Sequence, residues 1–307
     1  MIMIQIGLLV LGFAMLVKGA DWFVDGTSKV ARKLGIPQLV VGLTIVAMGT
    51  SAPEAAVSIT AALKGTADIA IGNVVGSNIL NILIILGITG VMTSVAIRKS
   101  TLKIEIPYML VATAILILMG YTGMCISRME GVIFLLMFLG YLTYLFLLAK
   151  KEKEVSEEVT QNIWVLLGIA VLGGFIVVWG SDITVDAAVK IASVIGLGER
   201  FIGLTIVALG TSLPELFTSV TAARKGNADI AIGNIVGSNI FNILFILGTT
   251  ALITPVPYER GFLTDGFVAV GAGVLLWVSV WKTMELRRKW GIIMLLCYLA
   301  YFIYLLM

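Results

Sequence analysis

Apolar stretches of about twenty residues alternate with short polar loops along the whole chain. A helix needs about 20 apolar residues to cross the hydrocarbon core of a membrane, so each stretch predicts one membrane-spanning helix. We therefore expect an all-α polytopic membrane protein with ten transmembrane helices. The stretches cover approximately residues 2–24, 37–62, 69–92, 104–122, 130–149, 162–184, 200–223, 230–253, 263–281 and 290–306.

A short charged segment divides the ten stretches into two sets of five. It reads KKEKEVSEE from Lys150 to Glu158, which predicts a solvated connector. We expect residues 1–149 to form a first five-helix repeat, residues 150–161 a cytoplasmic linker, and residues 162–307 a second, inverted five-helix repeat. The first apolar run has no Lys or Arg before it and no small-residue cleavage site after it, so we expect it to stay as the first span.

The two sets of stretches repeat each other at an offset of 161 residues. Residues 65–87 read GTADIAIGNVVGSNILNILIILG and residues 226–248 read GNADIAIGNIVGSNIFNILFILG, so only four of these 23 positions differ. Five spans, an odd number, separate equivalent points, and the second copy therefore enters the membrane from the opposite side. Two inverted five-helix repeats are typical of transporters with a substrate site near the bilayer midplane, between the halves.

The composition excludes several other classes of protein. Hydrophobic residues make up 59% of the chain and charged residues 13%, whereas a soluble domain carries about 25% charge. The chain has no histidine, and its two cysteines, Cys125 and Cys297, cannot build a CxxC metal site, so we expect no enzyme activity. Most Lys and Arg lie in alternate loops. By the positive-inside rule, a multi-pass protein of the cell (inner) membrane would then have both termini outside the cytoplasm.

Two of the 18 acidic residues, Glu54 and Glu215, lie deep in the predicted spans. They end two matching motifs, GTSAPE at residues 49–54 and GTSLPE at residues 210–215. An ionised carboxylate at this depth is costly and is seldom present without a functional partner. No Lys or Arg lies in the middle of a predicted span, so the compensating charge would be a bound cation or a proton.

The proline before each glutamate predicts a break in its helix. Proline has no N–H group, so the carbonyls of Gly49 and Gly210 lose their helical partners at Pro53 and Pro214. Irregular backbone at this depth is tolerated only where it lines a cavity buried in protein. The freed carbonyls would then join nearby hydroxyls as ligands. Those hydroxyls belong to Thr50, Ser51, Thr211 and Ser212.

The next span of each half adds neutral polar groups at helical spacing. Residues at positions i, i+4 and i+8 share one face of a helix, which we expect to face the glutamate of the same half. All the candidate ligands are oxygen or amide groups, which suit the hard cations Na⁺, Ca²⁺ and Mg²⁺. Two carboxylates carry a charge of −2, which one Ca²⁺ or two Na⁺ would neutralise. The neutral groups belong to Asn73, Ser77 and Asn81, and to Asn234, Ser238 and Asn242.

At these residues the chain resembles the calcium/cation antiporter superfamily and, within it, the sodium/calcium exchanger family of prokaryotic, ten-helix type with two α-repeats. The match pairs GTSAPE with GNVVGSNILN at residues 72–81, and GTSLPE with GNIVGSNIFN at residues 233–242. The resemblance implies alternating access, in which spans one and six slide past a fixed core of eight helices. One residue departs from the pattern, because exchangers of this type often have Asp where Asn242 stands.

The resemblance also implies which residues bind metal ions. The calcium site would consist of Glu54 and Glu215 with the carbonyls of Thr50 and Thr211. The sodium sites would use the Ala47 carbonyl, Thr50, Glu54 and Ser77 on one side, and the Ala208 carbonyl, Thr211, Glu215 and Ser238 on the other. Ser51, Ser212, Asn81 and Asn242 would line the centre.

These observations predict a secondary active antiporter that exchanges Na⁺ for Ca²⁺. A Ca²⁺/H⁺ antiporter stays open as an alternative, because two buried glutamates could carry protons instead. A Ca²⁺ channel is less favoured, since a channel places rings of charge around an open axis. We expect inorganic cations as transported partners, membrane lipid around the helices, no cofactor, no nucleic acid, and function as a monomer.

Overall fold

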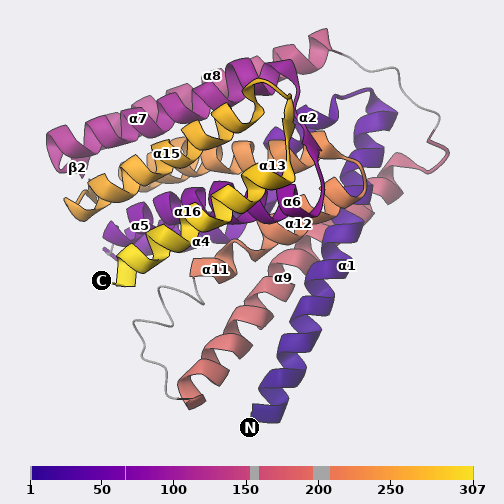
Figure 1. Ribbon diagram of the computed structural model, residues 1–307, viewed down its shortest axis with the longest axis horizontal. Helices are drawn as coiled ribbons and strands as arrows, with labels where there is room; N and C mark the ends of the chain where they lie inside the picture. Colours follow the sequence, from indigo (N-terminus) through magenta and orange to yellow (C-terminus); the bar gives the residue numbers. More distant parts are fainter. Residues whose placement is uncertain (1, 66, 153–158, 196–207, 307) are drawn as a thin grey trace.

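The computed structural model describes residues 2–65, 67–152, 159–195 and 208–306, and these residues are almost entirely helical (Figure 1). Segments marked η are π-helical. The first half contains α1 (Ile2–Leu34), α2 (Gln38–Val41), η1 (Gly42–Val46), α3 (Ala47–Thr50), α4 (Ala52–Leu63), α5 (Asp68–Leu80), η2 (Asn81–Leu86), α6 (Gly87–Met92), β1 (Val95–Ala96), η3 (Thr101–Glu105), α7 (Ile106–Gly123), β2 (Cys125–Ile126) and α8 (Arg128–Lys151). The second contains α9 (Ile163–Ile195), α11 (Ala208–Thr211), α12 (Leu213–Arg224), α13 (Ala228–Phe241), η5 (Asn242–Leu247), α14 (Gly248–Ile253), β3 (Val256–Pro257), α15 (Gly261–Trp281), β4 (Glu285–Leu286) and α16 (Arg288–Leu306).

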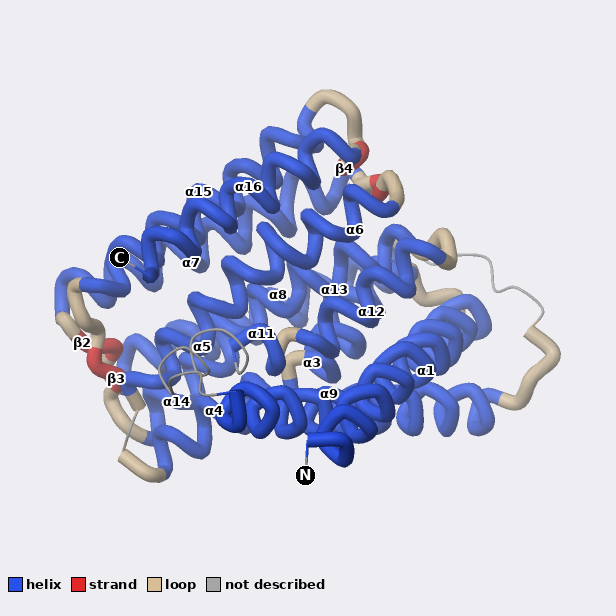
Figure 2. Tube along the Cα trace, turned by 60° about the horizontal axis from the view of Figure 1, so that its bottom comes forward, coloured by secondary structure: helices blue, strands red, loops and turns tan. Residues whose placement is uncertain are grey.

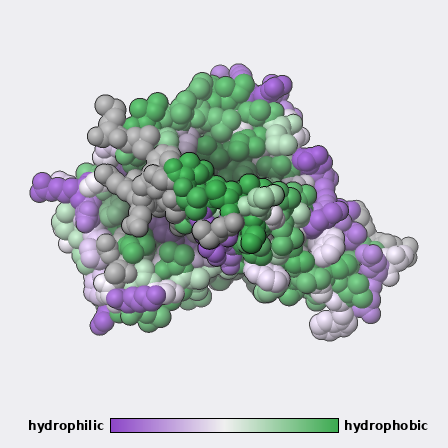
Figure 3. Space-filling model, turned by 90° about the horizontal axis from the view of Figure 1, so that it is seen from below, coloured by the Kyte–Doolittle hydropathy of each residue, from purple (hydrophilic) through white to green (hydrophobic). Residues whose placement is uncertain are grey.

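The helices have the length and apolarity of membrane spans. Eight helices in the described part of the chain could cross a membrane, and a ninth span results if the bent pair Gln38–Thr50 and Ala52–Leu63 counts as one. The protein is therefore a multi-pass helical membrane protein, as predicted. The expected span at 200–223 begins outside the described residues, so the total of ten stays a prediction. Figure 3 shows broad hydrophobic areas on one face, with hydrophilic residues mainly toward the sides of the view.

Helices α1 and α9 lie side by side and project from the rest of the bundle (Figures 1 and 2). Both have 33 residues, about 50 Å at 1.5 Å per residue, which exceeds the roughly 30 Å hydrocarbon core. The helices therefore continue beyond the predicted spans 2–24 and 162–184. The helix α1 continues through polar residues as far as Leu34, because the residues that end it, Gly35 with a φ of 65° and Pro37, come only after them.

Glycines allow the backbones of α1 and α9 to approach closely. A Cβ atom added at Gly12 would meet Thr184, one at Gly19 would meet Val177, and one at Gly26 would meet Ala170. Partner numbers fall along α9 as they rise along α1, so the two helices are antiparallel. Small residues provide such close contact between helices in membranes. Antiparallel packing of equivalent helices is what an inverted repeat requires, although the repeat as a whole stays a prediction.

The centre of the bundle is formed by α5 and α13, each followed by a π-helical segment. Almost every residue of α13 is buried, and η1 and α3 of the first half pack against it. Two short strand pairs also join the halves: β1 pairs with β4, and β2 pairs with β3, both antiparallel. The expectation of an all-α chain missed these strands, because two residues are too few to give an alternating pattern.

Candidate ion-binding site

Helix breaks place the two deep glutamates at the starts of new helices. Proline occupies the first turns of α4 and α12, and the residues before these helices, Ser51 and Ser212, have ψ angles of 10° and 5°. Helices α3 and α4 consequently meet at a bend of 50°. The predicted breaks are confirmed. They place Glu54 and Glu215 in the first turn of a helix, where the backbone dipole favours negative charge.

The two carboxylates are held by serines of the opposite half. The Ser51 hydroxyl donates to Oε1 of Glu215 at 2.8 Å, and the Ser212 hydroxyl donates to Oε1 of Glu54 at 3.4 Å. Each serine lies three residues before the glutamate of its own half, so the two breaks interlock and bring the carboxylates together. Both glutamates are only 1% exposed.

Four buried oxygens of this region have no hydrogen-bond donor among the described residues. They are Oε2 of Glu54, Oε2 of Glu215, Oδ1 of Asn81 and Oδ1 of Asn242. Each is an acceptor, and an unpaired buried acceptor costs free energy. The four oxygens come in equivalent pairs from the two halves. Carboxylate and amide oxygens are the ligands that hard cations prefer, so this set suits a bound cation.

Two further asparagines orient the amides of Asn81 and Asn242. Asn78 and Asn239 each donate to the backbone carbonyl of the other at 3.2 Å. The Asn81 side chain donates to Oδ1 of Asn239 at 2.9 Å. In the same way, the Asn242 side chain donates to Oδ1 of Asn78 at 3.0 Å. The amide donors are thereby occupied and the amide oxygens left free. Sequence reasoning missed Asn78 and Asn239 as site residues, although both stand in the repeated GSN motif.

The polar ladders make hydrogen bonds to both halves of the chain. Asn73 donates to the Glu54 carbonyl at 3.1 Å, and Asn234 donates to the Glu215 carbonyl at 3.4 Å. Asn81, by contrast, donates to Asn239 of the other half, and the expectation that the whole ladder faces its own glutamate stays a prediction. Eight residues of helix span about 12 Å, so one ladder can reach both halves. The same amides also bond to two serines that were not predicted, Ser58 at 2.9 Å and Ser219 at 2.8 Å.

Other predicted ligands gather where α3 meets α13. The Thr50 hydroxyl lies 3.0 Å from Oδ1 of Asn234 and 3.3 Å from the Ala47 carbonyl, and Ser238 donates to that same carbonyl at 3.3 Å. Ser238 thus meets Ala47 in this structure, whereas the family resemblance groups it with Ala208. The remaining predicted residues are Ser77, which is buried, Thr211, which is half-buried, and Ala208, whose side chain lies outside the described residues.

A cavity of about 290 Å³ reaches the helix breaks from the side of α9. The Ser181 hydroxyl of α9 donates to the Gly210 carbonyl at 2.7 Å, so a serine that the sequence did not single out satisfies this carbonyl, which Pro214 deprives of its helical donor. The position equivalent to Ser181 in the first half is Ala20. The cavity is lined by Pro53, Ser181, Asp182, Val185, Asp186, Gly210 and Thr211.

Two other acids of the candidate spans are bonded to tyrosines, and Asp21, Asp25, Asp182 and Asp186 also lie within candidate spans. Glu105 is fully buried and accepts a hydrogen bond from the Tyr144 hydroxyl. Asp265 accepts one from Tyr301 at 2.8 Å. Both lie near the starts of the apolar stretches 104–122 and 263–281, where a polar residue is expected at the boundary of a span. The hydrogen-bond partner of each is a tyrosine and not a second carboxylate.

Paired carboxylates buried in a polytopic helical protein are typical of cation transporters. The sodium/calcium exchanger protein family matches residues 4–147 and 165–307. The chain belongs to this family, which confirms the resemblance found in the sequence. It is therefore an antiporter and not an enzyme, and its small partners are transported ions rather than cofactors.

Individual relatives match nearly the whole chain. An antiporter named CaxA from Alkalimonas amylolytica is 38% identical and aligns over 94% of this chain and 95% of its own length. The sodium/calcium exchanger MaX1 from Methanosarcina acetivorans is 33% identical over 99% of both chains. A solved structure of the sodium-calcium exchanger NCX_Mj superposes with a TM-score of 0.88 at 31% identity, covering 99% of this chain and 100% of that one.

Proposed function

We propose that this protein exchanges Na⁺ for Ca²⁺ across the membrane by alternating access at a central site around Glu54 and Glu215. The observation that carries the proposal is the set of four unpaired acceptor oxygens on Glu54, Glu215, Asn81 and Asn242. One Ca²⁺ would neutralise the two carboxylates and be coordinated by several of these oxygens. Two Na⁺ would neutralise the same charge, so the two kinds of ion would compete for one site.

The neutral groups beside the carboxylates favour Na⁺ over H⁺ as the driving ion. A proton needs only a carboxylate oxygen, whereas Na⁺ is bound by several oxygens at once. The region where α3 meets α13 offers the Thr50 and Ser238 hydroxyls and the Ala47 carbonyl within a few ångströms of one another. The relative MaX1 is named a sodium/calcium exchanger, which supports Na⁺ and Ca²⁺ as the two exchanged ions. A Ca²⁺/H⁺ antiporter is the second candidate, since the name of CaxA specifies no ion.

Gradient-driven uptake separates the two candidates. Purified protein in proteoliposomes would receive external radioactive Ca²⁺ under an outward Na⁺ gradient at equal pH, or under an outward H⁺ gradient without Na⁺. We expect uptake with the Na⁺ gradient only. Uptake driven by the H⁺ gradient alone would establish the Ca²⁺/H⁺ alternative, and single-channel currents in planar bilayers would establish a channel.

We also propose that both termini lie outside the cytoplasm and that the protein works as a monomer in the cell (inner) membrane. The strand pairs support the alternation of the loops between the two sides, and the Lys and Arg bias supports the orientation. The loops that carry β1 and β4 are both rich in Lys and Arg and would both face the cytoplasm, whereas the loops that carry β2 and β3 would both face outward. Loops assigned to one side thus pair with each other.

A further inference from the structure

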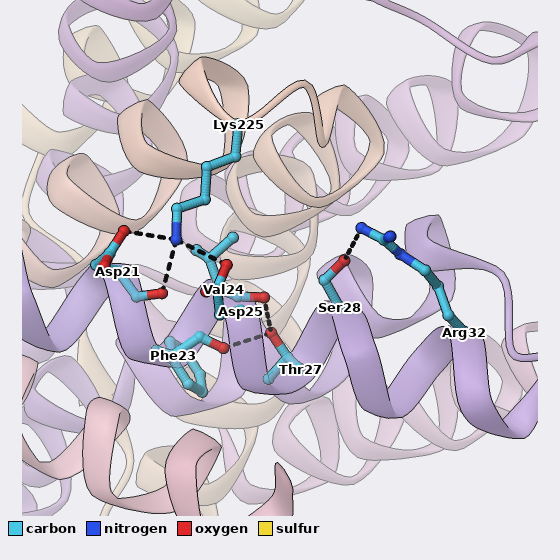
Figure 4. Close-up of polar contacts among 8 residues, drawn as sticks. All are labelled: Asp21, Phe23, Val24, Asp25, Thr27, Ser28, Arg32 and Lys225. Atoms are coloured by element: carbon cyan, nitrogen blue, oxygen red, sulfur yellow. Dashed lines mark hydrogen bonds and ion pairs between the residues drawn. The ribbon is translucent and has the colours of Figure 1, made fainter. Parts of the chain in front are cut away.

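Lys225 ties the projecting helix α1 to the helix that carries Glu215. It follows directly after α12, and its Nζ lies 2.5 Å from Oδ1 of Asp21, 2.7 Å from Oδ1 of Asp25 and 3.0 Å from the Asp21 carbonyl (Figure 4). The two aspartates are one turn apart on α1, so both reach the same ammonium group. These three acceptors match the three N–H donors of a lysine.

The repeat contains the same three residues a second time. An offset of 161 carries Asp21 to Asp182, Asp25 to Asp186 and Lys225 to Lys64. Lys64 follows α4, as Lys225 follows α12, and the two aspartates lie on α9. Equivalent residues are therefore placed on equivalent helices.

The second set is open in this structure. Among the described residues, no ion pair joins Lys64 to Asp182 or Asp186, and all three are exposed. Asp182 and Asp186 instead line the cavity of about 290 Å³ that reaches Pro53 and Thr211 beside the central site. One set of charges is thus paired, whereas the aspartates of the equivalent set line a cavity.

The close packing of α1 and α9 couples the two sets. The glycine contacts of α1 with α9 make these helices one body, which carries all four aspartates, while both lysines end helices of the central bundle. In the proposed orientation Lys225 lies at the inner side and Lys64 at the outer side. Outward sliding of the pair would draw Asp21 and Asp25 away from Lys225, and the same movement would bring the aspartates of α9 toward Lys64.

We propose that Lys225 with Asp21 and Asp25 forms an inner latch that holds the outer passage open, and that Lys64 with Asp182 and Asp186 forms an outer latch in the opposite state. This inference rests on the proposed alternating access. The latches are mutually exclusive, because a single movement of α1 and α9 breaks one and forms the other. Their role is to set the relative population of the two states, without contact to the transported ions.

Labelling of a reporter cysteine in the outer cavity tests the two latches. Val185→Cys would be introduced after replacing Cys125 and Cys297 by alanine, and its reaction with an impermeant maleimide measured in proteoliposomes. Lys225→Gln removes the inner cation and should slow labelling roughly two- to fivefold, the range of a partly exposed ion pair. Lys64→Gln, the matched variant, should speed labelling or leave it at its maximum, and Lys225→Arg should react like the parent protein.

The direction of the effects separates a latch from a merely structural ion pair. Equal effects of Lys225→Gln and Lys64→Gln, or faster labelling in Lys225→Gln, would overturn the proposal. Equilibrium ⁴⁵Ca²⁺ binding should persist in both variants, because neither lysine contacts Glu54 or Glu215, and its persistence shows that the variants are folded. Labelling needs no ion gradient, so the latches can fail while Na⁺-driven uptake stands, and the reverse also holds.

Discussion

The Ser51 hydroxyl donates a hydrogen bond to Glu215 Oε1 at 2.8 Å, although the two residues are 164 positions apart. The bond joins the helix break of one half to the carboxylate of the other, and Ser212 makes the equivalent bond to Glu54. Any movement that separates the two halves at this point must disturb both carboxylates. Ion binding and the relative position of the halves are thereby linked, as alternating access requires.

Replacing either central glutamate by glutamine should abolish Ca²⁺ transport while leaving the protein folded. Glu54→Gln and Glu215→Gln are nearly isosteric, but each removes one negative charge. The Coulomb energy of a divalent ion with each carboxylate is twice that of a monovalent ion, so Ca²⁺ binding suffers more than Na⁺ binding. Proteoliposome flux and ⁴⁵Ca²⁺ binding measure the effect, with Glu259→Gln in an exposed loop as control. Near-normal exchange by Glu54→Gln would rule out this pair as the transport site.

Removing a neutral ligand should weaken the Na⁺ dependence more than Ca²⁺ binding. Ser77→Ala and Ser238→Ala leave both carboxylates in place and delete one hydroxyl each. Na⁺ depends on several neutral oxygens, so the Na⁺ concentration for half-maximal exchange should rise several-fold. Titration of Na⁺-driven flux and of Ca²⁺ binding checks this, and Ser94→Ala on an exposed loop is the control. A larger change in Ca²⁺ than in Na⁺ would place these serines at a calcium site instead.

A bulky residue at the contact of α1 with α9 should destabilise the protein. A Cβ atom at Gly19 would lie 2.8 Å from the Val177 backbone nitrogen, so Gly19→Val forces the helices apart. Overpacking of this kind costs about 1–3 kcal/mol. Gly7→Val is the matched control on the same helix, because nothing lies within 4 Å of a Cβ atom there. Thermal unfolding in detergent should show a lower midpoint for the first variant only, and equal midpoints would contradict the close packing.

The orientation of the loops can be read from cysteine accessibility. In a protein without its native cysteines, Thr160→Cys in the linker should react in intact cells only with membrane-permeant thiol reagents. Glu259→Cys, in the loop after β3, should react with impermeant reagents as well. Both positions are exposed, so burial does not limit either reaction. The reverse pattern would invert the proposed orientation, and reaction of both with impermeant reagents would exclude the topology.

The inner latch should not depend on pH near neutrality. Burial lowers the pKa of Lys225, but the hydrogen bonds from its ammonium to Asp21 and Asp25 outweigh burial and raise the pKa above its ordinary value. Because the pKa of Lys225 is raised, the stabilisation by its ion pairs is complete below the unfolded lysine pKa of about 10.4 and is lost only at higher pH. The labelling difference between Lys225→Gln and the parent protein should therefore stay constant from about pH 6 to about pH 9. A difference that disappears within this range would point to another group.

The sequence alone determined the membrane class, the two repeats, the helix breaks before Pro53 and Pro214, and the paired acids Glu54 and Glu215. The repeats follow from the similarity of residues 65–87 to residues 226–248, and the other features follow from local chemistry: apolar length, the missing N–H of proline, and the cost of a charge in hydrocarbon. Such features act within one helix and are therefore readable along the chain. The family resemblance rested on the same residues, and the comparison with known proteins confirmed it.

Only the tertiary structure decided which groups meet. Ser51 holds Glu215 rather than its neighbour Glu54, and Asn81 bonds to Asn239 of the other half. The sequence also could not reveal that Lys225 reaches two aspartates about 200 residues away on α1. Helical periodicity reports which side chains share a face. Contacts between the halves depend instead on where the helices cross, and the crossing is set by close approaches such as that of Gly19 to α9.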